Sequence, residues 1–344
     1  MNRPLIHAAL HSRFKLRTYF LAACLICLHA TSSAQEVQAR AEAMLVHARQ
    51  LSDIRSPGAP AFRLQATFSF LGDNLEPVQG TYTETWFSDL QWRRETVIGD
   101  SRHIEIAGST KYWRVYPDGF PAQAIRLPAL MTFLPPASLQ LSFASISEHA
   151  TPSVIAECAY SRPVAQNQSF VFCFEKKSGV LLEKTLPEKR PRNVVSFSCE
   201  YGSFRKFGNY EFPHEVVCLE DRHKTISADI VDLSIEPPMD PALFTPPADA
   251  IELDRCFGKT VRPTLSDFDL MIPDVDLDRV AWITVWFVVD TKGRPQDLRI
   301  LRSISKGSHE KALDKVRNSR FNPGTCDGKP IAMVTSLEIP STPK

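Results

Sequence analysis

The stretch RFNPGTCDGKP, residues 320–330, marks the change from a charged helical run to a final apolar strand. Pro323 has no backbone N–H and cannot continue a helix, so we expect the helix before it to end here. Asp327-Gly328 favours a reversal of the chain. Cys326 lies in this turn. Whether it forms a disulfide bond depends on the compartment in which the protein folds.

The segments around this turn predict a small module of order β-β-α-β. Residues 281–290 carry apolar side chains on both faces, which is typical of a central or doubly covered strand. Gly293 suits a hairpin turn, and residues 297–304 form the expected return strand. Ala312, Leu313 and Val316 are spaced as the buried stripe of a helix that runs to about residue 320. Residues 330–340 complete the module as the last strand.

This module resembles the TonB C-terminal domain over roughly residues 260–340. The resemblance rests on "VDTKGRPQDLRILRS", on "ALDKVRNSRFNP" ending in Phe-x-Pro, and on "GKPI" before the last strand. It implies that Phe321 closes the helix end onto the sheet, and that a partner protein adds an extended segment beside residues 331–339. The residues predicted to form that partner-binding edge are Ile331, Met333, Thr335 and Leu337.

The chain departs from that family in two respects. The usual lead-in is replaced by "LSDFDLMIPDVDLDRV", and there is no long proline-rich spacer behind a membrane anchor. An energy transducer needs both a spacer and an anchor to reach between two membranes. The resemblance therefore implies partner binding and leaves energy transduction open.

The preceding part predicts an amphipathic helix over residues 36–51, followed by short strands of an antiparallel meander. It is similar to the LolA-type carriers of outer-membrane lipoproteins through this helix, the strands at residues 63–71 and 81–88, and "FGNYEFPHEV". The resemblance implies a curved, half-barrel-like antiparallel sheet with helices, and an α+β, β-rich chain overall. Phe68, Tyr82, Trp86 and Trp113 either line a lipid cavity or form an ordinary core.

The first residues indicate export. Four basic residues and no acid precede an apolar run at residues 19–30, and small residues follow before Gln35. This pattern predicts a signal peptide cleaved after Ala34, with a retained membrane anchor as the less favoured alternative. We expect four segments: a signal peptide at 1–34, a LolA-like domain at 35–235, a proline-rich connector at 236–255 and the TonB-like domain at 256–344.

Six cysteines follow the predicted leader, and an even, widely spaced set in an exported chain argues for disulfide bonds. Six cysteines allow 15 pairings. Proximity in the sequence favours Cys158–Cys173, Cys199–Cys218 and Cys256–Cys326, without excluding the others. No pair has zinc-ligand spacing, so no metal site and no cofactor are expected.

The sequence contains no catalytic motif such as HExxH, GxSxG or a P-loop, and we expect no enzyme. Without the predicted leader the chain has 36 basic and 39 acidic residues, a net charge of about −3, which indicates no basic face for nucleic acid. The favoured hypothesis is a periplasmic adaptor of the cell envelope that binds a protein partner and is linked to transport across the outer membrane. The partner would then be an outer-membrane transporter. The alternative is a periplasmic carrier or chaperone that binds acyl lipid or lipoproteins in the half-barrel.

Overall fold

The structure, a computed structural model, describes residues 34–71, 76–116, 120–121, 124, 127, 131–132, 134, 141–151, 154–162, 169–189, 194–220, 223–235, 240–266, 272–274, 281–302 and 308–343. The predicted signal peptide therefore lies outside the described residues, apart from Ala34. The chain divides into two compact units, Met1–Ser52 with Leu134–Pro187, and Asp53–Phe133 with Glu188–Lys344. The four predicted segments remain a prediction.

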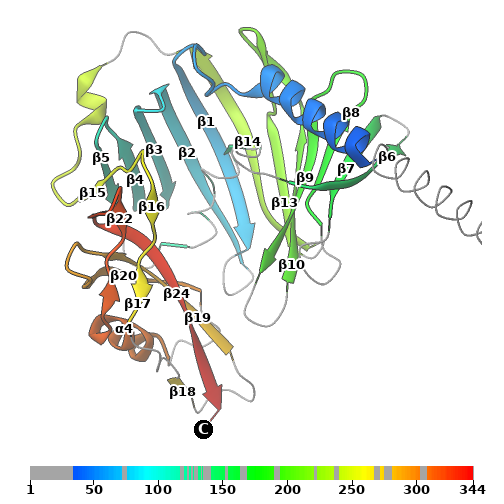
Figure 1. Ribbon diagram of the computed structural model, residues 1–344. Coiled ribbons are helices and arrows are strands. Elements are labelled where there is room, and N and C mark those ends of the chain that lie inside the picture. Colours follow the sequence, from blue (N-terminus) through cyan, green and yellow to red (C-terminus); the bar gives the residue numbers. More distant parts are fainter. Residues whose placement is uncertain are drawn as a thin grey trace, which may run out of the picture. The chain divides into compact units, whose positions relative to one another are not determined.

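The first unit contains a helix over residues 34–52 and the strands β6 (Phe143–Ala150), β7 (Ile155–Ser161), β8 (Val171–Glu175) and most of β9 (Leu181–Lys189). Gln38 ties the helix to the sheet: its amide donates to the carbonyl of Leu141 at 2.9 Å and accepts from the backbone N–H of Phe143 at 2.7 Å. Ala41, Leu45 and Ala48 form the buried stripe of the helix. The amphipathic helix predicted from the sequence thus packs beside these strands (Figure 1).

The second unit contains the larger part of the antiparallel sheet, in the order β15 (Ile251–Asp254), β5 (Lys111–Val115), β4 (Ser101–Ala107), β3 (Gln91–Ile98), β2 (Pro77–Ser88), β1 (Phe62–Leu71), β14 (His223–Ile235), β13 (Glu215–Glu220) and β10 (Val194–Gly202). β1 alternates strictly between buried and more exposed side chains, because one face of the sheet is covered. A hairpin of β11 (Arg205–Phe207) and β12 (Tyr210–Phe212) follows β10.

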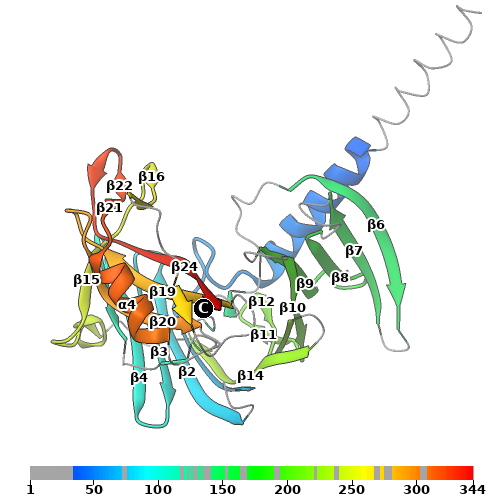
Figure 2. The same ribbon diagram turned by 90° about the horizontal axis from the view of Figure 1, so that it is seen from below.

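The same unit ends in the C-terminal module, whose sheet has the order β18 (Ile272–Asp274), β24 (Met333–Pro343), β19 (Ala281–Val289) and β20 (Pro295–Arg302). The helix α4 (His309–Asn318) covers one face of this sheet (Figure 2). Short strands pair around it: β16 (Thr260–Val261) with β22 (Thr325–Cys326), β22 with β23 (Lys329–Pro330), and β17 (Thr264–Leu265) with β21 (Phe321–Asn322). β19, β20, α4 and β24 confirm the predicted order β-β-α-β.

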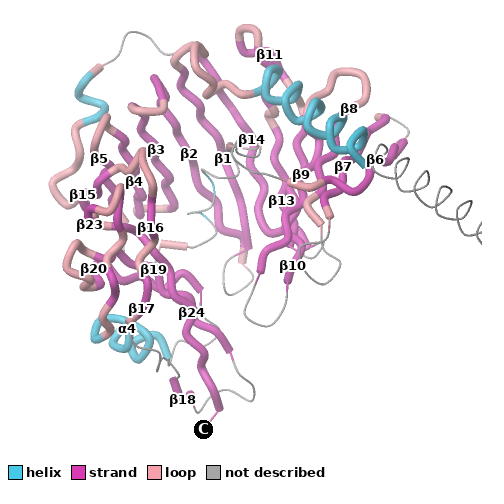
Figure 3. The backbone as a smooth tube through the Cα atoms, in the orientation of Figure 1, coloured by secondary structure: helices cyan, strands magenta, loops and turns pink. Residues whose placement is uncertain are grey.

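Strands dominate the described residues and helices are few (Figure 3). The predicted fold class is confirmed: the protein is α+β and β-rich, with a large curved antiparallel sheet that does not close into a barrel in the described residues, and a small C-terminal domain.

Three disulfide bonds join Cys158 to Cys173, Cys199 to Cys218, and Cys256 to Cys326. The first two link residues that stand directly opposite each other on neighbouring strands, β7 with β8 and β10 with β13. The third closes a sequence separation of 70 residues within the C-terminal module. Disulfide bonding is thus confirmed, and the pairs are those that sequence proximity favoured.

Candidate functional site

The strand β24 has an open side. β19 pairs with it from Met333 to Ser341, whereas the short β18 pairs with it only from Ser341 to Pro343. Within the described residues, the part of β24 from Met333 to Pro340 therefore has a neighbouring strand on one side alone. Alternate backbone N–H and C=O groups of such a strand point outward without a partner. This part of β24, the open edge, can accept a further strand.

The structure places three of the four predicted edge residues on this strand. Met333, Thr335 and Leu337 stand opposite Val289, Phe287 and Val285 of β19, so they share the face that packs toward α4. Ile331 precedes β24, and its N–H donates to the carbonyl of Gly324 at 2.9 Å. The part that these residues take in binding remains a prediction.

A compact core holds the open edge in place. Ile283, Val285, Phe287 and Val289 of β19 are almost completely buried, and Ala312 and Val316 of α4 pack against them. Phe321 follows α4 and lies with its ring centroid 5.0 Å from that of Phe287. This is the closure of the helix end that the resemblance implied. The edge therefore belongs to a preformed sheet, so little ordering of β24 is needed before a partner strand can add.

The opposite face of β19 is covered by the larger sheet of the same unit. Trp286 is 7% exposed, and its ring centroid lies 4.6 Å from that of Tyr116. The guanidinium of Arg114 lies 4.7 Å from the centroid of the Trp286 ring. Arg299 of β20 donates to the carbonyl of Tyr116 at 3.2 Å. The prediction that residues 281–290 are covered on both faces is thus correct for the buried Trp286 and Val288.

The connector also joins the sheet. β15 pairs with β5 from Ile251↔Arg114 to Asp254↔Lys111 and so becomes an edge strand of the larger sheet. Arg255, which follows it, donates to the carbonyls of Gly108 at 2.8 Å and of Asp89 at 2.7 Å. The sequence predicted only an extended linker. Beyond Pro247, however, the chain has backbone N–H groups again and can pair with β5.

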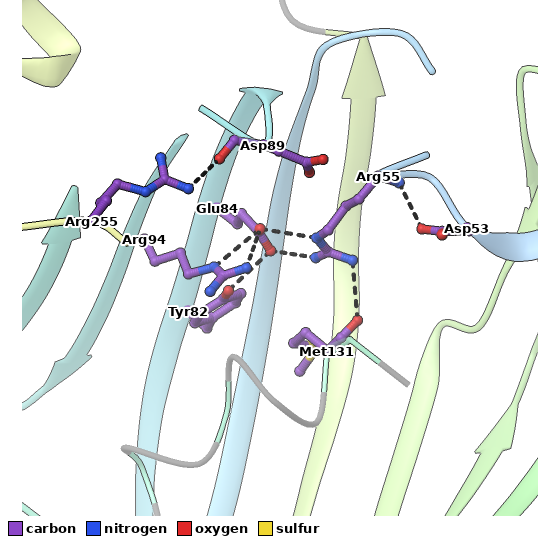
Figure 4. A network of polar contacts seen from close by, with 8 residues as sticks. All are labelled: Asp53, Arg55, Tyr82, Glu84, Asp89, Arg94, Met131 and Arg255. Carbon is purple, nitrogen blue, oxygen red and sulfur yellow. Dashed lines mark hydrogen bonds and ion pairs between the residues drawn. The ribbon is translucent and has the colours of Figure 1, made fainter. Parts of the chain in front are cut away.

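A buried ionic network lies on the inner face of β2 and β3 (Figure 4). Glu84 is fully buried and accepts hydrogen bonds from Arg94 Nε and Nη2, both at 3.1 Å, and from the Tyr82 hydroxyl at 3.0 Å. Arg55 approaches the same carboxylate with Nε at 3.1 Å and with Nη2. Burial alone would raise the pKa of Glu84, but the two guanidinium groups lower it to about 2. The carboxylate is therefore charged in the folded protein.

The four residues predicted to line a lipid cavity occupy different positions. Phe68, Tyr82 and Trp86 are buried side chains of β1 and β2, and Trp86 stacks on Phe62 with 5.6 Å between ring centroids. Trp113 is half-buried on β5, and its Nε1 donates to Glu252 of β15 at 3.2 Å. Three of the four thus contribute to the packed interior, and their lining of a lipid site remains a prediction.

His103 lies at the end of the same inner face, beside the residues that meet Trp286. It is 2% exposed, stacks on Tyr116 at 4.1 Å and lies 5.5 Å from the ring of Phe120. Its Nε2 is 3.8 Å from a carboxylate oxygen of Glu105, which in turn binds Arg114 at 2.7 Å. Burial lowers the pKa of His103 to about 4, with Glu105 opposing this shift and Arg114 adding to it.

We expect stability to fall as pH decreases from about 6.5 to 4, because the unfolded chain binds a proton at His103 before the folded protein does. The loss attributable to this residue is at most roughly 3 kcal/mol. His103→Phe keeps a ring against Tyr116 and removes the titration. Urea unfolding at a series of pH values should give a flatter profile for this variant over that window. Parallel profiles for the two proteins would contradict the assignment.

Residues 279–340 match the family described as Gram-negative bacterial TonB protein C-terminal. The match spans β19, β20, α4 and most of β24, and it confirms the resemblance predicted for this module. No protein with a curated description matches the chain. No described helix is both long and apolar enough to cross a membrane.

Two solved structures illustrate the fold likeness. A LolA superfamily protein from Nitrosomonas europaea is 8% identical, with a TM-score of 0.40 over 59% of this chain and 96% of that chain. A DUF1329 family protein from Desulfovibrio piger is 11% identical, with a TM-score of 0.41 over 59% of this chain and 96% of that chain. A LolA-type protein is thus among the structures that this chain resembles, as predicted.

Proposed function

We propose that this chain is a protein-binding adaptor of the cell envelope. The observation that carries the proposal is the open edge of β24 from Met333 to Pro340. An extended segment of a partner would pair with this edge through backbone hydrogen bonds, while Met333, Thr335 and Leu337 select its side chains. The match to the TonB C-terminal family supports this class of module.

The compartment proposed is the periplasm. Three disulfide bonds favour an oxidising environment, since such bonds seldom persist in a reducing cytosol. Cleavage after Ala34 would release the chain there, and the proposed partner is an outer-membrane transporter. The buried packing of Phe68, Tyr82 and Trp86 leads us to assign partner binding to the C-terminal module rather than to a lipid site on the larger sheet.

Two neighbouring proline substitutions test the open edge. Backbone N–H groups alternate along a strand, so one of Thr335→Pro and Ser336→Pro removes an outward N–H and the other removes one that faces β19. The variant that lacks only an outward N–H, called the outward variant, keeps all hydrogen bonds to β19. It should therefore show the smaller decrease in melting temperature. Affinity capture from detergent-extracted outer membranes should then recover one envelope protein with the wild type and at least tenfold less with the outward variant.

Glu310→Ala is the matched control, because Glu310 is exposed on the first turn of α4. We expect it to recover the partner as the wild type does. Equal recovery by the wild type and the outward proline variant would show that the edge of β24 is not the binding site.

A further inference from the structure

One corner of the C-terminal module presents apolar side chains on a rigid frame. We call residues 255–262 together with residues 325–330 the stapled corner. Phe257 is 65% exposed and Val261 is 51% exposed. Isolated exposed apolar residues are common on protein surfaces and need no explanation by themselves. What distinguishes these two is the support beneath them and the charge around them.

The support is covalent and hydrogen-bonded. The Cys256–Cys326 disulfide joins the two segments, and Thr260 and Val261 pair with Cys326 and Thr325. Figures 1 and 2 show β16 and β22 side by side. Asp327 makes two hydrogen bonds with the backbone of Lys259: its Oδ1 accepts from the N–H of Lys259 at 2.8 Å, and its own N–H donates to the carbonyl of Lys259 at 2.9 Å.

Gly258 leaves room for the hydrogen bonds between Asp327 and Lys259. A Cβ atom at this position would lie 1.9 Å from a carboxylate oxygen of Asp327, so a side chain here would force Asp327 away from Lys259. Phe257 immediately precedes this glycine, and its ring lies 4.8 Å from the guanidinium carbon of Arg255. The exposure of Phe257 therefore occurs on an ordered corner and is not a consequence of a loose loop.

The charge at the corner is positive, although the whole chain carries only +1. Lys259, Arg262 and Lys329 are all exposed there. The carboxylate of Asp327 is engaged with the backbone of Lys259. The nearest acids of β15, Glu252 and Asp254, are paired with Lys111 at 2.7 and 2.8 Å. The corner thus combines two apolar side chains with three exposed cations.

This combination suits a lipid surface better than a protein surface. A stable protein interface needs about 800 Å² on each partner and is depleted in lysine, whereas two of the three exposed cations here are lysines. At a membrane, a few apolar side chains enter the boundary between headgroups and acyl chains, and each lysine or arginine gains attraction from anionic lipid. Only these few side chains have to contact the lipid surface.

We propose that the stapled corner binds the surface of an anionic phospholipid bilayer. Phe257 and Val261 enter the interfacial layer, while Lys259, Arg262 and Lys329 lie against headgroup phosphates. The inference does not depend on the partner-binding role of β24, since it concerns different residues of the same module. It gives a chain without a described membrane-spanning helix a means of lying against a membrane.

Co-sedimentation of the full, oxidised chain with lipid vesicles tests the proposal. The wild type should be retained by vesicles of phosphatidylcholine mixed with phosphatidylglycerol, and much less by phosphatidylcholine alone. Phe257→Ser should lower the affinity for these vesicles about tenfold, because one aromatic side chain no longer enters the interfacial layer. Lys259→Gln combined with Lys329→Gln should lower that affinity roughly 30-fold, and added salt should reduce wild-type binding.

Val231→Ser is the matched control, because Val231 is 60% exposed on β14, away from the corner in sequence. We expect it to bind vesicles as the wild type does. The proposal is overturned if the wild type does not bind anionic vesicles, or if Phe257→Ser and Val231→Ser bind these vesicles equally. It is also overturned if Phe257→Ser loses only the protein partner captured through β24, since the corner would then serve protein docking.

Discussion

Replacing Glu84 by glutamine is expected to lower the free energy of unfolding by about 3–5 kcal/mol, because it leaves two buried arginines without their counter-charge. The side chains of Arg55 and Arg94 are 12% and 18% exposed, and that of Glu84 is 0% exposed. Glutamine keeps the size of the side chain, but it removes the charge and replaces one accepting oxygen by an NH2 donor that faces guanidinium donors. Urea unfolding followed by tryptophan fluorescence measures the difference.

Glu95→Gln is a matched control on the same sheet. Glu95 also has two arginine partners, Arg93 and Arg102, each at 3.1 Å, but its side chain is 23% exposed and that of Arg102 is 58% exposed. Partly solvated pairs of this kind contribute less than about 1 kcal/mol. If Glu84→Gln costs no more than Glu95→Gln, the buried network does not stabilise the sheet in the way its geometry indicates.

The network shows what the sequence could and could not predict. Alternation along residues 81–86 puts Tyr82, Glu84 and Trp86 on one face of a strand, and all three side chains are buried in the structure. The arginine partners of Glu84 could not be predicted from the sequence. Arg55 comes from the turn after the first helix, and Arg94 from the facing strand, where the register Glu84↔Arg94 depends on a hairpin turn. Register and long-range contacts are tertiary properties that no local period encodes.

The C-terminal module was predicted more completely, because its pattern is local. The β-β-α-β order and the closure by Phe321 follow from residues close together in the sequence or from the family resemblance. Apolar residues on both faces of residues 281–290 correctly indicated double coverage. The cover on the second face, Arg114 and Tyr116, lies about 170 residues earlier, and no local pattern indicates that contact.

Trp286→Ala is therefore expected to have the second large effect, a loss of about 3–5 kcal/mol in the free energy of unfolding. The substitution empties the space beside Tyr116 and removes the ring that faces the Arg114 guanidinium. Arg114 is itself held by Glu105 at 2.7 Å, so it cannot readily move to fill the gap. The contact between β19 and the inner face of the sheet should weaken while the core around Phe287 and α4 stays intact.

Hydrogen exchange separates a loosened junction from a general loss of stability. β15 pairs with β5 next to Arg114, so the amides of residues 251–254 should lose protection in Trp286→Ala. The amides of β19 that pair with β24 should keep theirs under native conditions. Trp286→Phe retains a ring at the junction and should protect residues 251–254 almost as the wild type does. Unchanged protection in Trp286→Ala would mean that β15 and Arg255 hold the connector without this contact, and that the two faces of β19 are energetically independent.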